Sequence, residues 1–520
     1  MLEFTLALIA AGLLATSAVS ADVSLDEIRQ MRQQAAERDR RIIFNNDGCD
    51  ATAYDIEATP EALLEVRTTP LIGSQVDTIF YCTNRGTFAR HSHDARASET
   101  FLETEGRFEN CIMPELIEQG IDPLEIMVQF AREHDYEIFW SERMNDTHDA
   151  SRPENLSQWK KDHPEYLVGS SDDRPPKGRW SSVDYAHEAV RDKMAAIIED
   201  VITRYDVDGI ELDFFRHPCF FASQAWEGEA SAEDVDTMTA FIRRIRDLCE
   251  RVGAERGRPL LIAVRIQDDG DYRMALGLDL ETWLAEDLVD IVTAGGYFRL
   301  NEWEETVRLG HRHGKQVYAG LSESRLRDRE GRNALEVYRA RATNALQAGV
   351  DGIYMFNYFN PNRPLWHEVG SRDTMRGKTK HFYATYRGPR TARSWLEGGD
   401  RFYARPTLCP DAPARVTSDS PAESDIIIRE DFDAARETGF TPTVTMRVQV
   451  EDLSDVGQFA LTLNGQRLPA GTVEDGWVAI EAAPSLLRDG RNTVKMSLAD
   501  DAGDVTVTDL MVVISYEEDA

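Results

Sequence analysis

The chain has 520 residues, with 58 Lys or Arg and 92 Asp or Glu, so its formal net charge is -34 at pH 7. Such an acidic protein repels phosphate backbones, which argues against nucleic acid as a partner. The length accommodates one large domain and one smaller domain. The six cysteines show no metal-ligand spacing and no Cys-x-x-Cys motif, and any disulfide pairing stays open.

The first residues are typical of a secretion signal. Residues 2–19 form an apolar run, and Val19-Ser-Ala21 provides small residues at a cleavage point before Asp22. The run carries Glu3 and no Lys or Arg at its start, which departs from the usual pattern. We predict a signal peptide over residues 1–21 and a periplasmic or secreted protein, with an uncleaved anchor as the alternative. No later run is apolar enough to span a bilayer, so no membrane contact is expected after cleavage.

Eight apolar runs with strand character follow, and helix-like segments separate them. The runs cover residues 41–47, 76–83, 136–141, 209–215, 260–267, 289–298, 316–321 and 352–358. Eight alternating strand and helix units predict an α/β fold, a (β/α)8 TIM barrel over residues 22–395. A doubly wound sheet is the alternative, but its glycine-rich phosphate turn is missing after the first run.

The pattern changes after residue 388, where prolines mark a linker and short alternating strands follow. These strands cover residues 444–450, 459–463, 477–480, 492–498 and 505–514. We predict a linker and a small β-sandwich over residues 396–520. An accessory packing role is the main hypothesis for this part, and carbohydrate binding is the alternative.

One strand carries acids where a buried strand should have none. In the run Asp208-Gly-Ile-Glu-Leu-Asp-Phe-Phe-Arg-His217, Glu211 and Asp213 face the same side because side chains alternate. In a closed barrel that side is the interior, where an unpaired carboxylate is costly. We predict that Glu211 forms a buried ion pair with Arg265, and that Asp213, nearer the strand end, takes part in chemistry.

Polar residues gather at the predicted carboxyl ends of the strands, where (β/α)8 enzymes place their sites. Paired carboxylates suit glycosidic bond cleavage, because one acid protonates the leaving oxygen while the other attacks carbon or activates water. The predicted pair is Asp213 with Glu323, and the rival acids are Asp268 and Asp269. The residues predicted to hold the substrate are Asp47, Arg143, Asn145, Asp146, His148, Arg216, Arg265, Tyr297 and Asn357.

Other chemistries have weaker support. The sequence contains no Walker loop, no His-Glu-x-x-His motif and no Gly-x-Ser-x-Gly elbow. His91 and His93 are read as a solvated loop pair, so no metal and no cofactor are expected. Arginines 143, 216, 265, 299 and 325 are predicted to gather near the barrel mouth. This suggests an anionic carbohydrate, sulfated or uronic, because Arg pairs with such groups bidentately.

Three motifs resemble one family of barrel proteins. They are the run Asp208–Pro218, Arg143-Met-Asn-Asp146, and Gly277-Leu-Asp-Leu-x-x-Trp283. Over roughly residues 41–386 the chain is similar to the glycosyl-hydrolase-like 10 group. The resemblance implies glycosidase ancestry, with the acid at the end of strand four at Asp213. The chitinase strand motif ends in a Glu, whereas this chain has Phe215 there.

We therefore predict an exported glycoside hydrolase that cleaves a polysaccharide or oligosaccharide with paired carboxylates. One alternative is a glycan-binding barrel without catalysis, since fold does not fix function. The other is a polysaccharide lyase that uses Tyr297 or His148 as its base. The sugar, the linkage, the anomeric outcome and the oligomeric state stay open.

Overall fold

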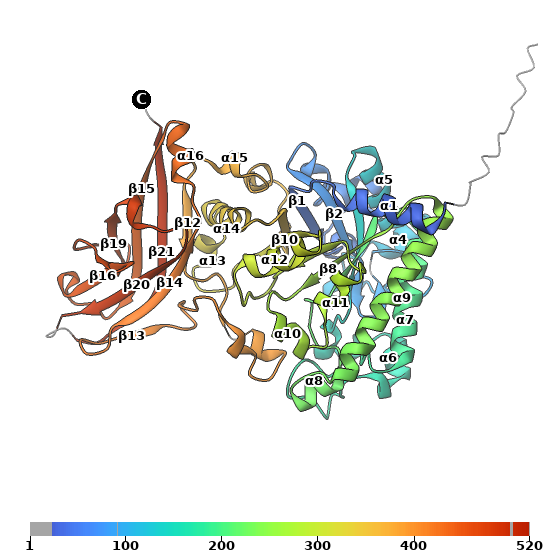
Figure 1. The fold of residues 1–520 in the computed structure, drawn as a ribbon. Helices are drawn as coiled ribbons and strands as arrows, with labels where there is room; N and C mark the ends of the chain where they lie inside the picture. Colours follow the sequence, from blue (N-terminus) through green and yellow to red (C-terminus); the bar gives the residue numbers. More distant parts are fainter. Residues whose placement is uncertain (1–22, 91, 390, 500–502, 519–520) are drawn as a thin grey trace, which may run out of the picture.

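The structure is a computed structural model that describes residues 23–90, 92–389, 391–499 and 503–518 (Figure 1). The predicted signal peptide, residues 1–21, lies outside the described residues, and so does His91. A barrel with surrounding helices makes up one side of the molecule, and the C-terminal strands form a separate body beside it (Figure 1).

Eight parallel strands form a closed barrel, in the order β1-β11-β10-β9-β8-β7-β6-β2. The strands are β1 (Ile42–Asn46), β2 (Val76–Cys82), β6 (Glu137–Arg143), β7 (Gly209–Asp213), β8 (Leu261–Ile266), β9 (Ile291–Ala294), β10 (Gln316–Ser322) and β11 (Gly352–Phe356). Each predicted run overlaps one of these strands, and only β6 and β10 extend beyond their predicted ends, by two residues and one residue. The predicted TIM barrel is therefore confirmed.

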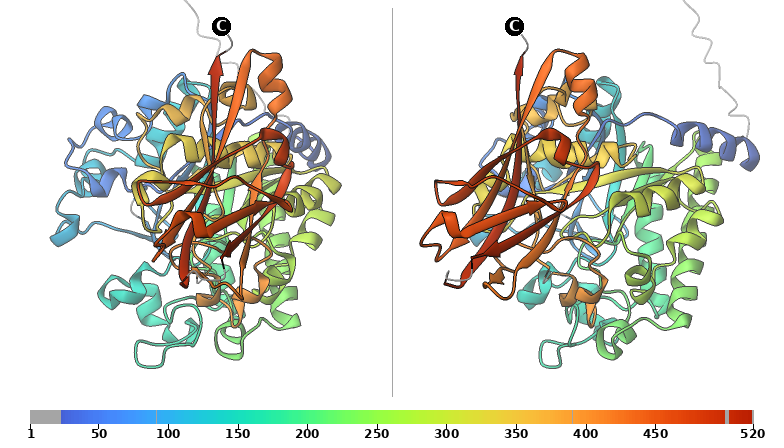
Figure 2. Two further views of the ribbon diagram at one scale, coloured as in Figure 1. Left: turned by 90° about the vertical axis from the view of Figure 1, so that its left-hand side faces the viewer. Right: turned by 60° about the vertical axis from the view of Figure 1, so that its left-hand side comes forward.

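Helices separate consecutive barrel strands and cover the outside of the barrel (Figures 1 and 2). The helices of the barrel region are α1 (Leu25–Ala36), α2 (Asp50–Ala53), α3 (Pro60–Glu65), α4 (Met113–Glu118), α5 (Pro123–Glu133), α6 (Gln158–Asp162), α7 (Glu188–Arg204), α8 (Ala222–Glu227), α9 (Ala232–Arg256), α10 (Gly270–Ala275), α11 (Leu280–Ala285), α12 (Trp303–Arg312), α13 (Arg329–Arg332), α14 (Leu335–Gln347) and α15 (Arg372–Met375). The longest, α9, begins with a capping box of Ser231 and Asp234 and ends at Gly257, whose φ of 71° suits glycine.

The barrel is filled from its amino-terminal end. Its interior cluster is entirely buried and consists of Ile43, Phe80, Phe139, Leu261, Ala263, Ile291, Tyr318, Tyr354 and Phe356. Helix α1 lies across this end, and its Ala35 and Ala36 pack against the cluster. Arg32 of α1 donates to Asp290 at 3.1 Å, which joins the helix to the segment before β9. Enzymes of this fold place their active sites at the opposite, carboxyl end of the barrel.

The C-terminal strands form two antiparallel sheets around their own core, which confirms the predicted β-sandwich. One sheet has the order β12-β21-β15-β19-β18, with β13 also paired to β21, and the other β14-β20-β16-β17. The strands are β12 (Lys380–Tyr383), β13 (Ala414–Val416), β14 (Ala422–Ile428), β15 (Phe440–Glu451), β16 (Phe459–Leu463), β17 (Gln466–Arg467), β18 (Thr472–Glu474), β19 (Trp477–Ala482), β20 (Gly490–Leu498) and β21 (Val505–Glu518). Helix α16 (Phe432–Glu437) connects β14 to β15.

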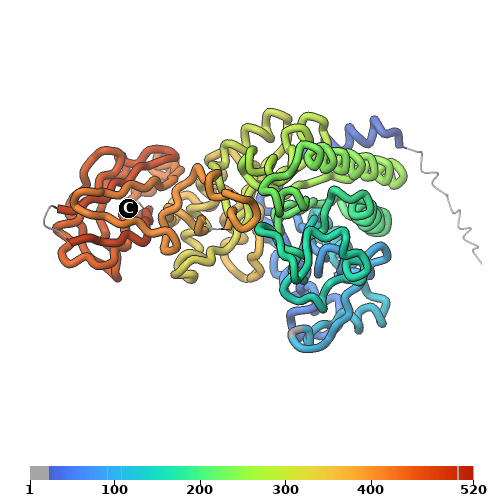
Figure 3. Tube along the Cα trace, turned by 90° about the horizontal axis from the view of Figure 1, so that it is seen from below, coloured from blue at the N-terminus to red at the C-terminus, as the bar shows by residue number. Residues whose placement is uncertain are grey.

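The chain crosses between the two bodies near the predicted boundary. Strand β12 precedes residue 395 yet pairs with β21, whereas Trp395 and Leu396 pack in the barrel core. The division at residue 395 stays a prediction. The sandwich lies against the barrel on the side of α14, as the view from below shows (Figure 3).

Two further observations concern the described residues alone. None of their helices combines the length and apolar composition needed to cross a membrane. All six cysteines fall within the described ranges and are present as free thiols, five of them buried.

Candidate active site

A cavity of about 450 Å³ opens at the carboxyl end of the barrel. This mouth cavity is lined by Asp47, Arg216, Glu323, Arg325, Asn333, Asn357, Tyr358, Phe359, Asn360 and Arg363. Four of these, Asp47, Arg216, Glu323 and Asn357, are predicted site residues, and each comes from the segment that follows a barrel strand. Its volume lies in the usual range for small-molecule sites.

Two carboxylates reach the mouth cavity, and each has an arginine partner. Asp47, after β1, accepts from Arg67 Nη1 at 2.6 Å and is 16% exposed. Glu323, after β10, accepts from Arg329 Nη2 at 2.6 Å and is 29% exposed. Arg329 is itself largely exposed, so its charge is well solvated. Glu323 is therefore the more accessible of the two acids.

Asp213 has a different environment from the one predicted. Its Oδ1 accepts from Arg265 Nε at 2.9 Å and from the backbone N–H groups of Phe215 and Arg216 at 2.9 and 3.0 Å. Its Oδ2 accepts from Arg265 Nη2, and only 2% of the residue is exposed. Asp213 fixes the turn that carries Arg216 into the mouth cavity. Its catalytic role stays a prediction, and these contacts favour a positioning role.

The predicted ion pair of Glu211 with Arg265 is wrong. Arg265 pairs with Asp213 because these two residues lie opposite each other in the register of β7 and β8, whereas Glu211 lies opposite Ala263. Glu211 instead accepts from Ser141 Oγ and from Tyr354 OH, the latter at 3.0 Å. Burial raises the pKa of the Glu211 carboxyl to about 7, which the Arg265 charge only partly opposes.

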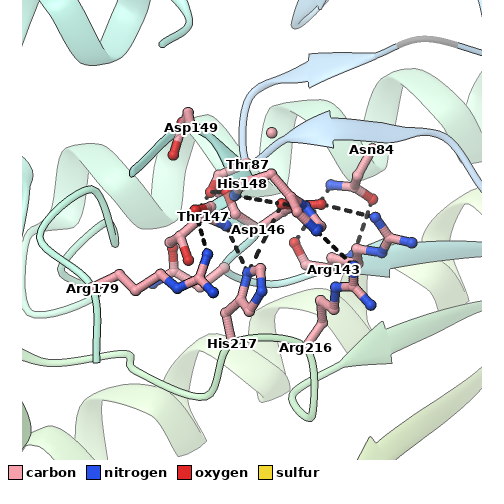
Figure 4. Close-up of polar contacts among 12 residues, drawn as sticks. Asn84, Thr87, Arg143, Asp146, Thr147, His148, Asp149, Arg179, Arg216 and His217 are labelled. Carbon is pink, nitrogen blue, oxygen red and sulfur yellow. Dashed lines mark hydrogen bonds and ion pairs between the residues drawn. The ribbon is translucent and has the colours of Figure 1, made fainter. Parts of the chain in front are cut away.

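Asp146 is the centre of a buried polar network (Figure 4). Arg143 Nη1 donates to its Oδ2 at 2.9 Å, and His148 Nδ1 lies 2.5 Å from its Oδ1. Burial alone would raise the pKa of Asp146, but His148 and Arg143 hold it well below its ordinary value. Asp146 is therefore an anion that fixes the orientation of the His148 ring.

His148 is the exposed end of this network. Its Nε2 lies 2.7 Å from Arg216 Nη2, and its side chain is 36% exposed. Asp146 raises the pKa of His148, but burial and the charges of Arg216 and Arg143 outweigh this effect and lower it. With Nδ1 bonded to Asp146, neutral His148 offers its Nε2 lone pair to Arg216.

Arg216 has unused donor capacity at the edge of the mouth cavity. Its Nε and Nη1 are buried and have no hydrogen-bond partner in the described part of the chain, although the residue is only 9% exposed. Burial and the nearby Arg143 charge lower the pKa of Arg216 to about 10. A negatively charged group that accepts hydrogen bonds would satisfy these two donors and offset the cost of burying the Arg216 charge.

Tyr297 lies among three arginines. The guanidinium carbons of Arg216, Arg325 and Arg387 lie 5.3, 5.6 and 5.8 Å from the centre of its ring. Its hydroxyl is 3.4 Å from Asn357 Nδ2, so it also meets β11. Of the five arginines predicted to gather near the mouth, Arg216 and Arg325 line the cavity, whereas Arg143 and Arg265 are paired inside the barrel.

Two other predicted site residues bond to backbone. Asp268 accepts from the N–H groups of Leu300 and Asn301, which holds the loop after β9. Asn145 bonds to the backbone of Val183 and Cys219 and holds two loops together. Both residues are buried, and neither lines the mouth cavity.

Asp146, His148 and His217 offer possible metal ligands, with one ligand atom from each within 4.8 Å of the others. The atoms already have other partners, however. Arg143 donates to Asp146, Arg216 contacts His148, and the Thr147 N–H donates to His217 Nδ1 at 3.0 Å. Burial and the Arg216 charge hold the pKa of His217 well below its ordinary value. Two guanidinium cations fit this cluster better than a metal cation does.

Sequence reasoning did not assign Tyr358 and Arg363 to the site. Both lie in Asn357-Tyr-Phe-Asn-Pro-Asn-Arg363, which follows β11 and supplies half of the lining of the mouth cavity. The signal was present, because this polar run comes directly after the last barrel strand. Phe359 of the same run packs under Arg67, 4.0 Å from the guanidinium carbon.

Residues 104–235 match the family described as glycosyl hydrolase-like 10. The matched segment contains two of the three motifs noted above, those at Arg143 and at Asp208–Pro218. No curated protein sequence matches the chain.

Several solved glycoside hydrolase structures are distantly similar. The GH36 α-galactosidase AgaA of Geobacillus stearothermophilus, in complex with raffinose, is 13% identical with a TM-score of 0.37, over 91% of this chain and 59% of that chain. The chain therefore spans about three fifths of that enzyme's length.

The glycoside hydrolase domain of PgaB (BpsB) from Bordetella bronchiseptica is 11% identical with a TM-score of 0.38, over 65% of this chain and 97% of that one. A family 18 N-acetylglucosaminidase of Paenibacillus barengoltzii is 13% identical with a TM-score of 0.36, over 65% and 98%. Together with the closed barrel, the family match confirms over residues 104–235 the predicted resemblance to the glycosyl hydrolase-like 10 group.

Proposed function

We propose that this protein is an exported glycoside hydrolase that cleaves a carbohydrate bound in the mouth cavity. The observation that carries the proposal is that Asp47 and Glu323 line one cavity at the end of the barrel where such enzymes act. Hydrolysis needs one carboxyl group to protonate the leaving oxygen and a second to activate water or attack carbon. Glu323 keeps its predicted role, and Asp47 replaces Asp213 as its proposed partner.

We also propose that the substrate carries negative charge. Arg216, Arg325 and Arg363 line the mouth cavity, against only two carboxylates. Arg216 has two donor atoms without partners, and a sulfate or carboxylate group on the sugar would accept from them. This recognition would operate despite the strongly acidic body of the protein.

A panel of neutral, sulfated and uronic polysaccharides tests the proposal, with release of reducing ends as the measurement. Glu323→Gln and Asp47→Asn should each lower kcat about 10²–10⁴-fold, because each removes an acid or base. Glu330→Gln is the matched control, since Glu330 is an exposed acid on α13 outside the cavity. Full activity of both site variants would refute the assignment, and tight binding without turnover would support a glycan-binding barrel instead.

A polysaccharide lyase is the second candidate, because His148 is held neutral and in contact with Arg216. In that reaction Arg216 moves its Nη2 from His148 Nε2 to a uronic carboxylate, the freed Nε2 removes the proton on the carbon beside that carboxylate, and the glycosidic oxygen leaves and takes up a proton. Elimination forms an unsaturated product that absorbs ultraviolet light. That absorbance, lost in His148→Gln, would favour the lyase; reducing ends without it favour the hydrolase.

A further inference from the structure

A second and smaller cavity lies between the barrel and the sandwich. Its volume is about 50 Å³. This interdomain cavity takes its walls from the loop after β9, from α14, from the segment after β12, from the linker and from the end of β14. The arginines that line it are Arg299, Arg341, Arg387, Arg405 and Arg429.

One carboxylate, that of Glu302, lines the cavity together with these five arginines. Arg341 and Arg387 form no ion pair within 4.0 Å among the described residues. Arg405 meets Glu302 only at 3.7 Å, and Glu302 is shared with Arg491 at 3.6 Å.

The other two arginines are partly compensated. Arg299 is 3.8 Å from Asp268, whose oxygens already accept from backbone N–H groups. Arg429 alone has close carboxylate partners, Glu304 and Asp489. The cavity therefore carries excess positive charge.

Neutral groups hold the guanidinium groups in place. Arg341 Nη1 donates to the Ser322 carbonyl at 2.7 Å, and Arg387 Nη2 donates to Ser322 Oγ at 3.1 Å. Arg299 stacks on Trp303, with its guanidinium carbon 3.4 Å from the ring centre. These contacts orient the cations without neutralising them, so the arrangement is prepared for an anion.

Some of their donor atoms are unused. Among the described residues, Arg387 Nε is buried without a hydrogen-bond partner, and Arg299 Nε has only Asp268 Oδ2 nearby, at 3.8 Å, beyond hydrogen-bond distance. Burial and the neighbouring arginines lower the pKa of Arg387 to about 9 and that of Arg299 well below its ordinary value. Buried donors without acceptors are rare in proteins, and each is costly.

We propose that the interdomain cavity binds one tetrahedral oxyanion, a free sulfate or phosphate ion. A cavity of about 50 Å³ has room for a few water molecules or one such ion. The bound ion bridges Arg299, in the loop after β9, and Arg405 of the linker to Arg429, which directly follows β14 of the sandwich, and so fastens the two bodies together. The site is independent of the proposed hydrolase function.

Thermal unfolding in sodium sulfate and in sodium chloride at equal ionic strength tests this proposal. In the wild-type protein, millimolar sulfate should raise Tm by about 2–4 °C and then saturate, as expected for ligand binding worth about 1 kcal/mol. The general salting effect of sulfate instead grows steadily with concentration. Isothermal titration with inorganic phosphate provides a second measurement on the unmodified chain.

Arg405→Gln separates anion binding from a purely structural role. Because the change removes one of several like charges, Tm in chloride should stay equal or rise, while the saturable response to sulfate is lost. Arg299→Gln should behave in the same way and serves if Arg405→Gln does not fold. Arg401→Gln is the matched control, since Arg401 lies in the same linker, pairs with Glu229 on the surface and lies outside the cavity.

The outcomes are distinct. A saturable response in wild type and Arg401→Gln, at least tenfold weaker in Arg405→Gln, supports the proposal. No saturable response in wild type overturns it, and so does a response that Arg405→Gln retains. Tighter binding of a monosaccharide sulfate than of free sulfate would overturn the assignment to a free ion. None of these results depends on catalytic activity.

Discussion

The inner layer of the barrel and its mouth use the same residue types with opposite results. In the inner layer, Asp213 and Arg265 are almost wholly buried and form a bidentate pair, which leaves Arg265 Nη1 without a partner among the described residues. At the mouth, Glu323 and Arg216 line an open cavity, and Arg216 keeps two donors unused. The two layers are only a few residues apart along β7 and its following turn. Burial and pairing, rather than residue type, thus separate the charges that stabilise the barrel from those available to a ligand.

The sharpest way to break this comparison is to remove one partner of the buried pair. Asp213→Ala leaves Arg265 charged and buried, so the free energy of unfolding should fall by about 3–5 kcal/mol. Urea unfolding monitored by tryptophan fluorescence measures the loss. The double variant Asp213→Leu/Arg265→Met should recover much of it, because neither residue then leaves an uncompensated charge. A stable Asp213→Ala protein that has lost only activity would instead restore Asp213 as the catalytic acid.

The second test uses the pH dependence of stability. The pKa of Glu211 is raised by burial from its ordinary 4.5 to about 7, so the folded state holds this proton more tightly than the unfolded state does. The stability that this proton provides is complete below about pH 4.5 and is lost as the pH rises through about 7. Glu211→Gln removes this contribution, so its Tm should fall less between pH 5 and pH 8 than that of the wild type.

A second buried acid, Glu142, also contributes to the pH dependence of stability. Burial also raises its pKa to about 7, and it remains in the variant, so some pH dependence should persist. Identical profiles of Tm against pH for wild type and Glu211→Gln would contradict the raised pKa of Glu211 in the folded state. Glu211→Ala should lower folded yield more than specific activity, because it leaves the Ser141 and Tyr354 hydroxyl groups without their buried acceptor.

The smallest expected effect concerns the rim of the mouth cavity. Arg325 is exposed, so its contact with an anionic substrate is screened by solvent. Arg325→Gln should raise KM for an anionic glycan about three- to tenfold, with kcat nearly unchanged. Arg327→Gln is the control, because Arg327 is exposed in the same segment but does not line the cavity. Equal KM changes on neutral and anionic glycans would exclude charge recognition by Arg325.

The architecture could be predicted from the sequence because it depends on repeated local patterns. Eight apolar runs separated by helical segments identify the barrel, and alternating strands after a proline-rich linker identify the sandwich. Strand β12 was missed because Lys380–Tyr383 is short and its partner, β21, lies more than a hundred residues later. Such long-range pairing leaves little signal in a local pattern.

The site could be predicted only in part. Four residues predicted from their position after a strand line the mouth cavity: Asp47, Arg216, Glu323 and Asn357. Position along the strand did not show which of Glu211 and Asp213 pairs with Arg265, because alternation gives both acids the same face. The choice between them depends on the register of β7 against β8, which aligns Asp213 with Arg265. Neither strand encodes that register by itself.

Helix α1 has a consequence for orientation. It closes the barrel at the end opposite the mouth cavity, and Val23, which precedes it, lies beside Gly257 near this closed base. If the leader were retained as a membrane tether instead of being removed, the barrel would stand on the bilayer with its opening directed outward. Long polymers would then reach the cavity without passing between the protein and the lipid surface.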